Sequence, residues 1–177
     1  MTQELYQKAM KFAGEKHANQ KVPGTNANYL LHISNVAMEI ILAHSYNQNF
    51  DVNFALQVAI LHDTIEDTQT NFKELSLEFG EPIAKAVQAL SKDAQIISKK
   101  EKMLDSLIKI NTLQKEVGMV KIADRITNLQ KPPNQWNSEK IKNYLIEAKL
   151  ISSKLENMNS YLNNRLEEKI KEYENYI

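Results

Sequence analysis

Residues 59–68 read AILHDTIEDT and join an apolar run to a dense group of charged side chains. The run ends in His62 and Asp63, and Glu66 and Asp67 follow within one turn. In a continuing helix, Asp63, Glu66 and Asp67 share one face at spacings i, i+3 and i+4. Carboxylates so close together require a cation or a protonated member. For the His-Asp dipeptide alone, a helix cap or a surface salt-bridge cluster is the alternative interpretation. The apolar run before it predicts a buried helix, however, and charges at the end of a buried helix need a compensating partner such as a metal ion.

Two further polar residues stand among apolar neighbours. His32 lies in NYLLHISNVA, where on its own it is best interpreted as a core or capping histidine. Asp124 lies in MVKIADRITNLQ, where on its own it indicates a buried salt bridge. Taken together with His62 and Asp63, they would form a mixed nitrogen and oxygen site, which suits Mn²⁺, Fe²⁺ or Zn²⁺ better than Ca²⁺ or Mg²⁺. Helical bundles commonly build such sites from facing helices.

The rest of the chain predicts an all-α fold, because only four Gly and four Pro interrupt segments with helical periodicity. The 177 residues contain no repeat or flexible linker, so we expect a single domain over 1–177. From Ser138 the apolar pattern predicts one long amphipathic helix or two broken ones, which wrap the core or bind a partner. The other expected helices cover 3–19, 30–46, Asp51 to Leu61, Asn71 to Gly80, the segment from Pro82, 99–114 and 117–130.

Composition excludes several classes of function. Lys plus Arg equals Asp plus Glu at 22 each, and only Arg125 and Arg165 are arginine, which argues against nucleic-acid binding. The absence of cysteine rules out disulfides, thiolate metal sites and a cysteine nucleophile. No signal peptide and no apolar run of membrane-spanning length is present, so we expect a cytoplasmic protein with no membrane contact.

The order H…HD…D, with HDTIEDT and KIADRITNL, resembles the HD superfamily, in particular the hydrolase domain of Rel/Spo alarmone enzymes and their standalone small hydrolases. The resemblance covers about residues 8–131 and leaves 138–177 as a C-terminal helical extension. It implies a compact multi-helix bundle that hydrolyses the 3′-pyrophosphate of guanosine tetra- or pentaphosphate. The implied Mn²⁺ ligands are His32, His62, Asp63 and Asp124. Glu66 and Asp67 match the acidic pair that positions or activates the attacking water.

The resemblance also implies substrate contacts. Asn128 matches an asparagine one turn after the last metal ligand, and Lys99 aligns with a lysine that contacts phosphate, although an ordinary solvated lysine explains it equally well. Lys21 and Arg125 complete the expected substrate-binding set. Lys21 is the only basic residue of loop 21–28, KVPGTNAN, where the family usually carries an arginine that stacks on guanine.

That difference leaves two alternatives to guanine alarmones open. One is an HD phosphohydrolase that acts on another nucleotide, such as (p)ppApp, or on a different phosphate ester. The other is a non-catalytic helical module that binds a partner or a second copy through 138–177. The complete ligand set argues for the enzyme.

Overall fold

Residues 2–177, which the computed structural model describes, form helices joined by turns, with a single isolated bridge between Lys21 and Asn28. The all-α prediction is confirmed. The elements are α1 (Thr2–Lys16), α2 (Leu30–Tyr46), α3 (Val52–Leu61), α4 (Thr64–Asp67), α5 (Phe72–Phe79), α6 (Glu81–Leu90), α7 (Lys99–Asn111), α8 (Lys115–Asn128), α9 (Ser138–Lys154), α10 (Ser160–Tyr173) and the 3₁₀ turn η1 (Glu174–Tyr176).

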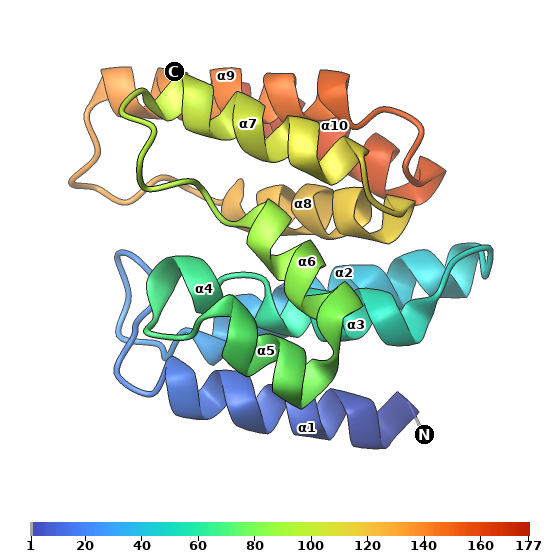
Figure 1. The fold of residues 1–177 in the computed structure, drawn as a ribbon. Helices are drawn as coiled ribbons and strands as arrows, with labels where there is room; N and C mark the ends of the chain where they lie inside the picture. Colours follow the sequence, from blue (N-terminus) through green and yellow to red (C-terminus); the bar gives the residue numbers. More distant parts are fainter. Residues whose placement is uncertain (1) are drawn as a thin grey trace.

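The helices lie in two layers (Figure 1). One layer holds α1 to α5, the other holds α7 to α10, and α6 leads from the first to the second. Helix α8 packs against α2 and α3 across the boundary between the layers, so it brings its side chains to the elements that carry the HD motif. Within residues 2–177 no helix combines the length and the apolar character needed to cross a membrane.

Helix α8 is buried on all sides, and its charged residues are paired accordingly. Every residue from Glu116 to Ile126 is buried. Glu116 accepts a hydrogen bond from the backbone N–H of Asp51, and Arg125 pairs with Glu147. Charged groups are rarely buried without partners, so these contacts allow a central helix to carry ionisable side chains.

Two predicted helix starts are observed. Asp51 accepts from the backbone N–H groups of Asn53 and Phe54 at the start of α3. Asn71 accepts from the N–H of Glu74 at the start of α5, which is half of the expected capping box. The other half is absent, because the Glu74 carboxylate accepts from Lys16 at 2.6 Å instead. Residues 112–114 separate α7 from α8. The predicted range 99–114 ends three residues later than α7, and the predicted range 117–130 ends two residues later than α8.

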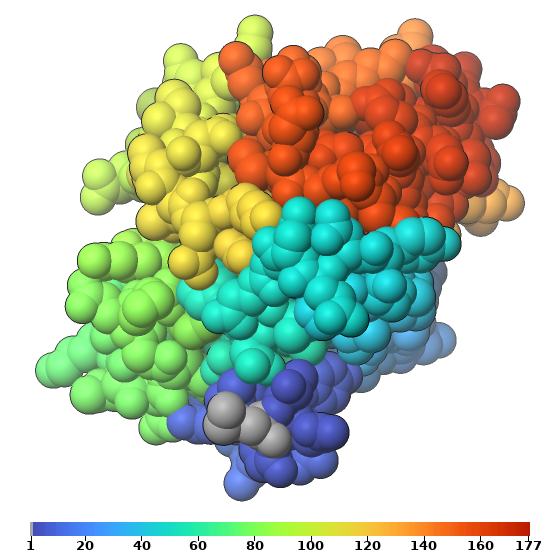
Figure 2. Space-filling model, turned by 90° about the vertical axis from the view of Figure 1, so that its right-hand side faces the viewer, coloured from blue at the N-terminus to red at the C-terminus, as the bar shows by residue number. Residues whose placement is uncertain are grey.

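The C-terminal segment forms two helices, so the broken alternative is the one observed. The chain reverses between α9 and α10, where Asn157 takes a left-handed φ of 66° and Asn159 caps α10 by accepting from the N–H of Leu162. Helix α10 packs on α8 and α2, and Arg165 binds buried Glu39 on α2 at 2.8 Å. Figure 2 shows the orange-red C-terminal segment directly against the cyan segment. The apolar side of 138–177 is therefore buried within the same chain.

Candidate active site

His62 lies immediately after α3, in the turn that leads to α4. The side chain is buried, and its Nδ1 lies 2.7 Å from the carbonyl oxygen of Ala59. Because a carbonyl only accepts, Nδ1 carries the proton and the neutral ring presents the Nε2 lone pair to the interior. A metal-binding histidine is typically oriented by such a bond from its other ring nitrogen.

His32, in the first turn of α2, is oriented in the same way. Its Nδ1 lies 3.3 Å from the hydroxyl of Thr127, and that hydroxyl donates to the carbonyl oxygen of Asp124 at 2.9 Å. Since the hydroxyl proton is used, Thr127 accepts from Nδ1–H of His32, and His32 also presents a free Nε2. The Nε2 atoms of His32 and His62 are 3.3 Å apart. Two facing lone pairs at that distance require a proton or a cation between them.

Asp63 and Asp124 bring carboxylate oxygens to the same point. Oδ2 of Asp63 is 2.9 Å from Nε2 of His62 and 3.8 Å from Nε2 of His32. Oδ1 of Asp124 is 3.4 Å and 3.8 Å from the Nε2 atoms of His32 and His62. Donors that share an ion at about 2.1 Å stand about 3 to 3.5 Å apart, so the four side chains fit a divalent metal. The ligand atoms of His32, His62 and Asp124 all lie within 4.8 Å of one another.

The electrostatics of this cluster also favour a cation. Burial by itself lowers the pKa of His62, but Asp63 and Asp124 outweigh burial and raise that pKa to about 9. Burial raises the pKa of Asp63, yet His62 holds it below its ordinary value. For Asp124, Lys121 and His32 overcome burial in the same direction. Both carboxylates therefore stay ionised, and the cluster takes up positive charge.

Three residues that sequence reasoning missed orient the two carboxylates or the rings. Tyr29 donates its hydroxyl to Oδ2 of Asp63, and Lys121 donates to Oδ2 of Asp124 at 3.3 Å. Thr127 is the third, through its contact with His32. Lys121 precedes Asp124 by three residues on the same buried helix, so helical spacing could have identified it. Nothing in the sequence near Tyr29 points to Asp63, which is 34 residues away.

The acidic pair lies on α4, but its two members have different partners. The chain turns at His62 and Asp63, and Asp63 then starts α4, where its carbonyl oxygen accepts from the N–H of Asp67 at 2.9 Å. Glu66 accepts from both the backbone N–H and the Nζ of Lys92, at 2.9 and 3.0 Å. Asp67 accepts from Nε2 of Gln20 at 2.7 Å, and its pKa is raised, mainly by burial. One carboxylate is thus held by a cation and the other by a neutral amide.

A cavity of about 480 Å³ opens beside the cluster, with His32 and Asn128 in its wall. Its other walls come from the loop around Val22 and from Trp136 and Tyr144, so it joins three distant parts of the chain. The two loops meet closely: a Cβ on Gly24, whose φ is 78°, would lie 3.1 Å from Pro133. Asn128 also donates to Oδ1 of Asp124 at 2.5 Å, so it links the cavity to the ligand cluster.

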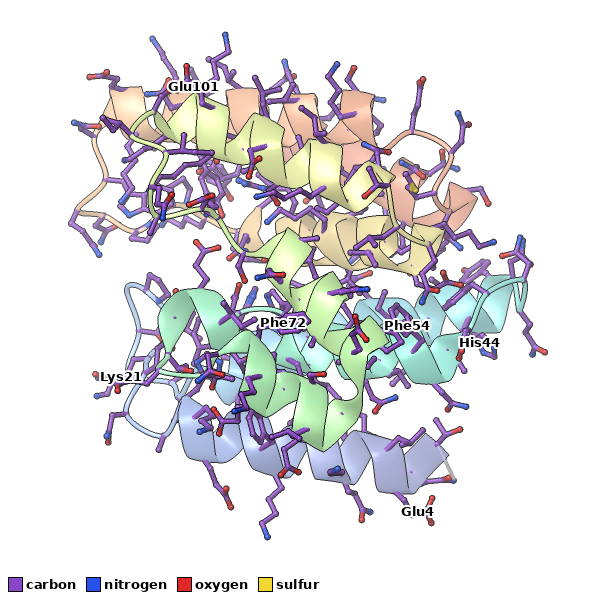
Figure 3. All side chains as sticks on the ribbon, viewed as in Figure 1. Glu4, Lys21, His44, Phe54, Phe72 and Glu101 are labelled. Atoms are coloured by element: carbon purple, nitrogen blue, oxygen red, sulfur yellow. The ribbon has the colours of Figure 1, made fainter. Side chains whose placement is uncertain are left out.

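The remaining predicted substrate residues are not brought to the ligand cluster. Arg125 is only 4% exposed; its guanidinium lies 4.2 Å from the ring centre of Tyr144 and binds Glu147. Lys21 is exposed, and Figure 3 shows it at the edge of the α1–α5 layer. Lys99 is exposed at the start of α7. None of the three lies in the wall of the cavity.

Comparisons with known proteins agree with this geometry. A family model described as an HD domain matches residues 9–166. The guanosine-3′,5′-bis(diphosphate) 3′-pyrophosphohydrolase MESH1 of Danio rerio is 31% identical over 162 residues, which cover 89% of this chain and 87% of that protein. A protein of the same enzymatic name from Aquifex aeolicus is 33% identical over 129 residues, 72% of this chain and 18% of that one. A solved structure titled as a metazoan ortholog of SpoT that hydrolyses ppGpp shares the fold, with a TM-score of 0.82 at 22% identity over 98% of this chain and 97% of that one.

Proposed function

This chain belongs to the HD-domain family, and on that premise we propose that it is a metal-dependent hydrolase of the 3′-pyrophosphate of ppGpp-like nucleotides. The observation that carries the proposal is the pair of imidazoles whose Nε2 atoms face each other at 3.3 Å between two ionised carboxylates. A solvated surface cluster would have no reason to orient both rings inward. The substrate class is inferred from the names of the relatives from Danio rerio and Aquifex aeolicus.

We propose Mn²⁺ as the ion, held by His32, His62, Asp63 and Asp124. Two nitrogen and two oxygen donors suit Mn²⁺ or another divalent transition metal better than Ca²⁺. When bound, such an ion supplies Lewis acidity, which acidifies water and withdraws electron density from a phosphoryl oxygen.

The acidic pair, Glu66 and Asp67, accepts the proton of the attacking water. Water adds to the phosphorus that bears the ribose 3′ oxygen, the bond from phosphorus to that oxygen breaks, and pyrophosphate leaves with the 3′ hydroxyl restored on the nucleotide. The water loses a proton to Glu66 or Asp67, and the ribose oxygen regains one. Lys92 donates to the Glu66 carboxylate from both its backbone N–H and its Nζ, which holds that carboxylate in place to accept a proton.

The nucleoside occupies the cavity beside His32. Trp136 and Tyr144 offer aromatic surface for a base, and Asn128 offers an amide next to Asp124. Lys21 and Lys99 are proposed to meet the phosphates at the rim, where flexible lysines can reach a polyanion. Arg125 acts on the cavity indirectly, because its guanidinium packs on the ring of Tyr144.

An adenine nucleotide such as (p)ppApp is the second candidate, and one observation favours it. The residues that line the cavity include no arginine, aspartate or glutamate. A carboxylate would read the N1–H and N2–H donors of guanine, and an arginine would stack on the base, so neither usual means of selecting guanine is present in this wall.

The test is to incubate purified protein with Mn²⁺ and ppGpp, and in parallel with ppApp, and to measure the nucleoside diphosphate and pyrophosphate released. We expect stoichiometric release of the two products, and no release after chelation of the metal. Absence of turnover with both nucleotides across Mn²⁺, Fe²⁺ and Zn²⁺ would contradict the proposal and favour either a different phosphate ester as substrate or the non-catalytic helical module.

A further inference from the structure

Gln20 lies in the turn after α1, and its backbone is held on both sides. Its N–H donates to the carbonyl oxygen of His17 at 3.0 Å, and its own carbonyl oxygen accepts from the N–H of Tyr29 at 2.9 Å. The second bond ties the end of α1 to the start of α2. The side chain of Gln20 therefore projects from a backbone that has little freedom.

The amide of Gln20 bridges two polar side chains, those of buried His17 and exposed Asp67. Nε2 donates to Oδ2 of Asp67 at 2.7 Å, and Oε1 lies 2.6 Å from Nδ1 of His17. An ionised carboxylate only accepts, so the NH₂ group must face Asp67 and the oxygen must face His17. His17 then donates from Nδ1, and the direction of the whole chain of bonds is determined.

His17 is itself fixed by packing. It is 1% exposed, and its ring lies 5.1 Å from the ring of Tyr29, the residue that donates to Asp63. Its Nε2 is buried and has no hydrogen-bond partner within residues 2–177, and turning the ring over would replace Nδ1 by a carbon atom and lose the bond to Gln20. His17 thus acts on Asp67 through Gln20, and it packs against Tyr29, which donates to Asp63.

We propose that Gln20, oriented by His17, is a positioning residue that holds the carboxylate of Asp67 in place for proton transfer during hydrolysis. This inference rests on the proposed function, which gives Asp67 its role. Within residues 2–177, Glu66 has a charged partner in Lys92, whereas the Asp67 carboxylate has only this amide as a hydrogen-bond partner. Removal of Gln20 therefore leaves Asp67 free to rotate on the short helix α4. Loss of a precise geometry at a reacting group costs rate rather than affinity.

The first experiment is a double-mutant cycle between Gln20 and Asp67. Gln20→Ala should lower kcat about tenfold, with KM and bound metal within twofold of wild type. In an Asp67→Ala background the same substitution should cause no further loss, because its target is gone. Asn19→Ala, at the exposed neighbouring position, is the matched control and should leave kcat unchanged. An equal loss in both backgrounds, or a loss in KM alone, would overturn the proposal.

A second variant separates the ring from its hydrogen bond. His17→Phe keeps an aromatic ring against Tyr29 but cannot donate to Gln20. We expect it to lower kcat in the same direction as Gln20→Ala, and to add nothing when combined with it. If His17→Phe behaved as wild type, His17 would have no part in orienting Gln20.

A readout that does not depend on turnover keeps this inference distinct from the proposed function. The bond from Gln20 lowers the pKa of Asp67 against the effect of burial, so Gln20→Ala should raise that pKa, measured by a ¹³C NMR titration of the carboxyl carbon. In the active enzyme the acidic limb of the kcat profile should move to higher pH with it. If wild type turned over no 3′-pyrophosphorylated nucleotide, the hydrolase assignment would fail while a raised pKa still supported the contact. An unchanged pKa would refute it.

Discussion

The ligand cluster and the neighbouring cavity differ in how they are built. His32, His62 and Asp124 come from helices α2, α3 and α8 or their ends, and a hydrogen bond to a helix residue orients each of them. The cavity is lined by seven residues from the loops after α1 and α8, together with residues of α2, α8 and α9, and its aromatic side chains are only partly buried. The chemistry is thus carried by rigid helices and the choice of substrate by loops, an arrangement that lets one reaction be kept while the substrate changes.

The strongest test of the rigid half is His62→Ala. Because the ring is a ligand and no neighbour can replace it, we expect loss of bound metal and a fall in kcat of at least about 10³-fold. Metal content by mass spectrometry and turnover of ppGpp measure the two effects. His44→Ala is the matched control, since His44 contacts the ring of Phe50 outside the cluster. Retention of metal and rate in His62→Ala would show that the cluster is structural.

This half of the site is also the half that the sequence predicts. Each ligand is a polar or charged residue within or at the end of an apolar helical segment. Such a residue needs a compensating partner when it is buried, so the sequence alone indicates it. Gln20 and Lys92 could not be found in this way. They follow α1 and α6, and only tertiary packing brings them to Asp67 and Glu66.

Loop positions also explain why the sequence does not predict the residues that line the cavity. Trp136 lines the same cavity as His32, where the loop of Gly24 lies against Pro133, and no sequence periodicity predicts that approach of two loops. Arg125, one of the predicted substrate-binding residues, directly follows Asp124. On a helix that is buried on all sides, however, neighbouring residues point in different directions, and Arg125 faces Tyr144 and Glu147.

Glu66→Gln separates metal binding from proton transfer within the rigid half. The amide cannot accept the proton from water, so kcat should fall by about 10² to 10³-fold while bound metal is unchanged. Rate and metal content are measured as for His62. Asp105→Asn is the control, because Asp105 is likewise a carboxylate paired with a lysine, Lys109. Loss of metal in Glu66→Gln would move Glu66 into the ligand set.

The pH dependence of metal binding tests the electrostatics of the ligand cluster. Without metal, the carboxylates raise the pKa of His62 to about 9, and a metal binds only the neutral ring. Each ion therefore displaces about one proton at neutral pH, and affinity should rise about tenfold per pH unit up to about pH 9, then level off. Titration calorimetry in buffers of different ionisation enthalpy measures the released proton.

The same pKa sets the stability of the metal-free protein. Because the folded pKa lies above the ordinary 6.5, protonated His62 contributes its full stabilisation below pH 6.5, and that contribution is lost as the pH rises through 9. With a chelator, Tm should fall between pH 6.5 and 9, whereas saturating metal should remove most of that fall. Equal slopes with and without metal would contradict the assignment.

Trp136→Ala tests the loop-built half. Loss of the indole removes aromatic surface from the cavity, so KM for ppGpp should rise about tenfold with kcat within twofold. The ratio of KM values for ppGpp and ppApp should also change, because the base is the part that contacts this wall. Tyr161→Ala is the control, since Tyr161 stacks on Tyr46 and does not line the cavity. A fall in kcat with KM unchanged would place Trp136 with the catalytic half.

The smallest effect is expected for Lys99, which tests whether the second layer reaches the substrate at all. Figure 3 places Glu101, two residues further along α7, at the outer edge of the α7–α10 layer, far from Lys21. An exposed lysine that meets a phosphate contributes about 0 to 1 kcal/mol, so Lys99→Ala should raise KM by no more than about fivefold. Lys100→Ala is the matched control, because Lys100 is an equally exposed neighbour on the same helix. A KM effect at Lys99 that is absent at Lys100 and disappears in high salt would identify a direct phosphate contact. Identical behaviour of the two variants would make Lys99 an ordinary solvated lysine and confine substrate binding to the cavity beside His32.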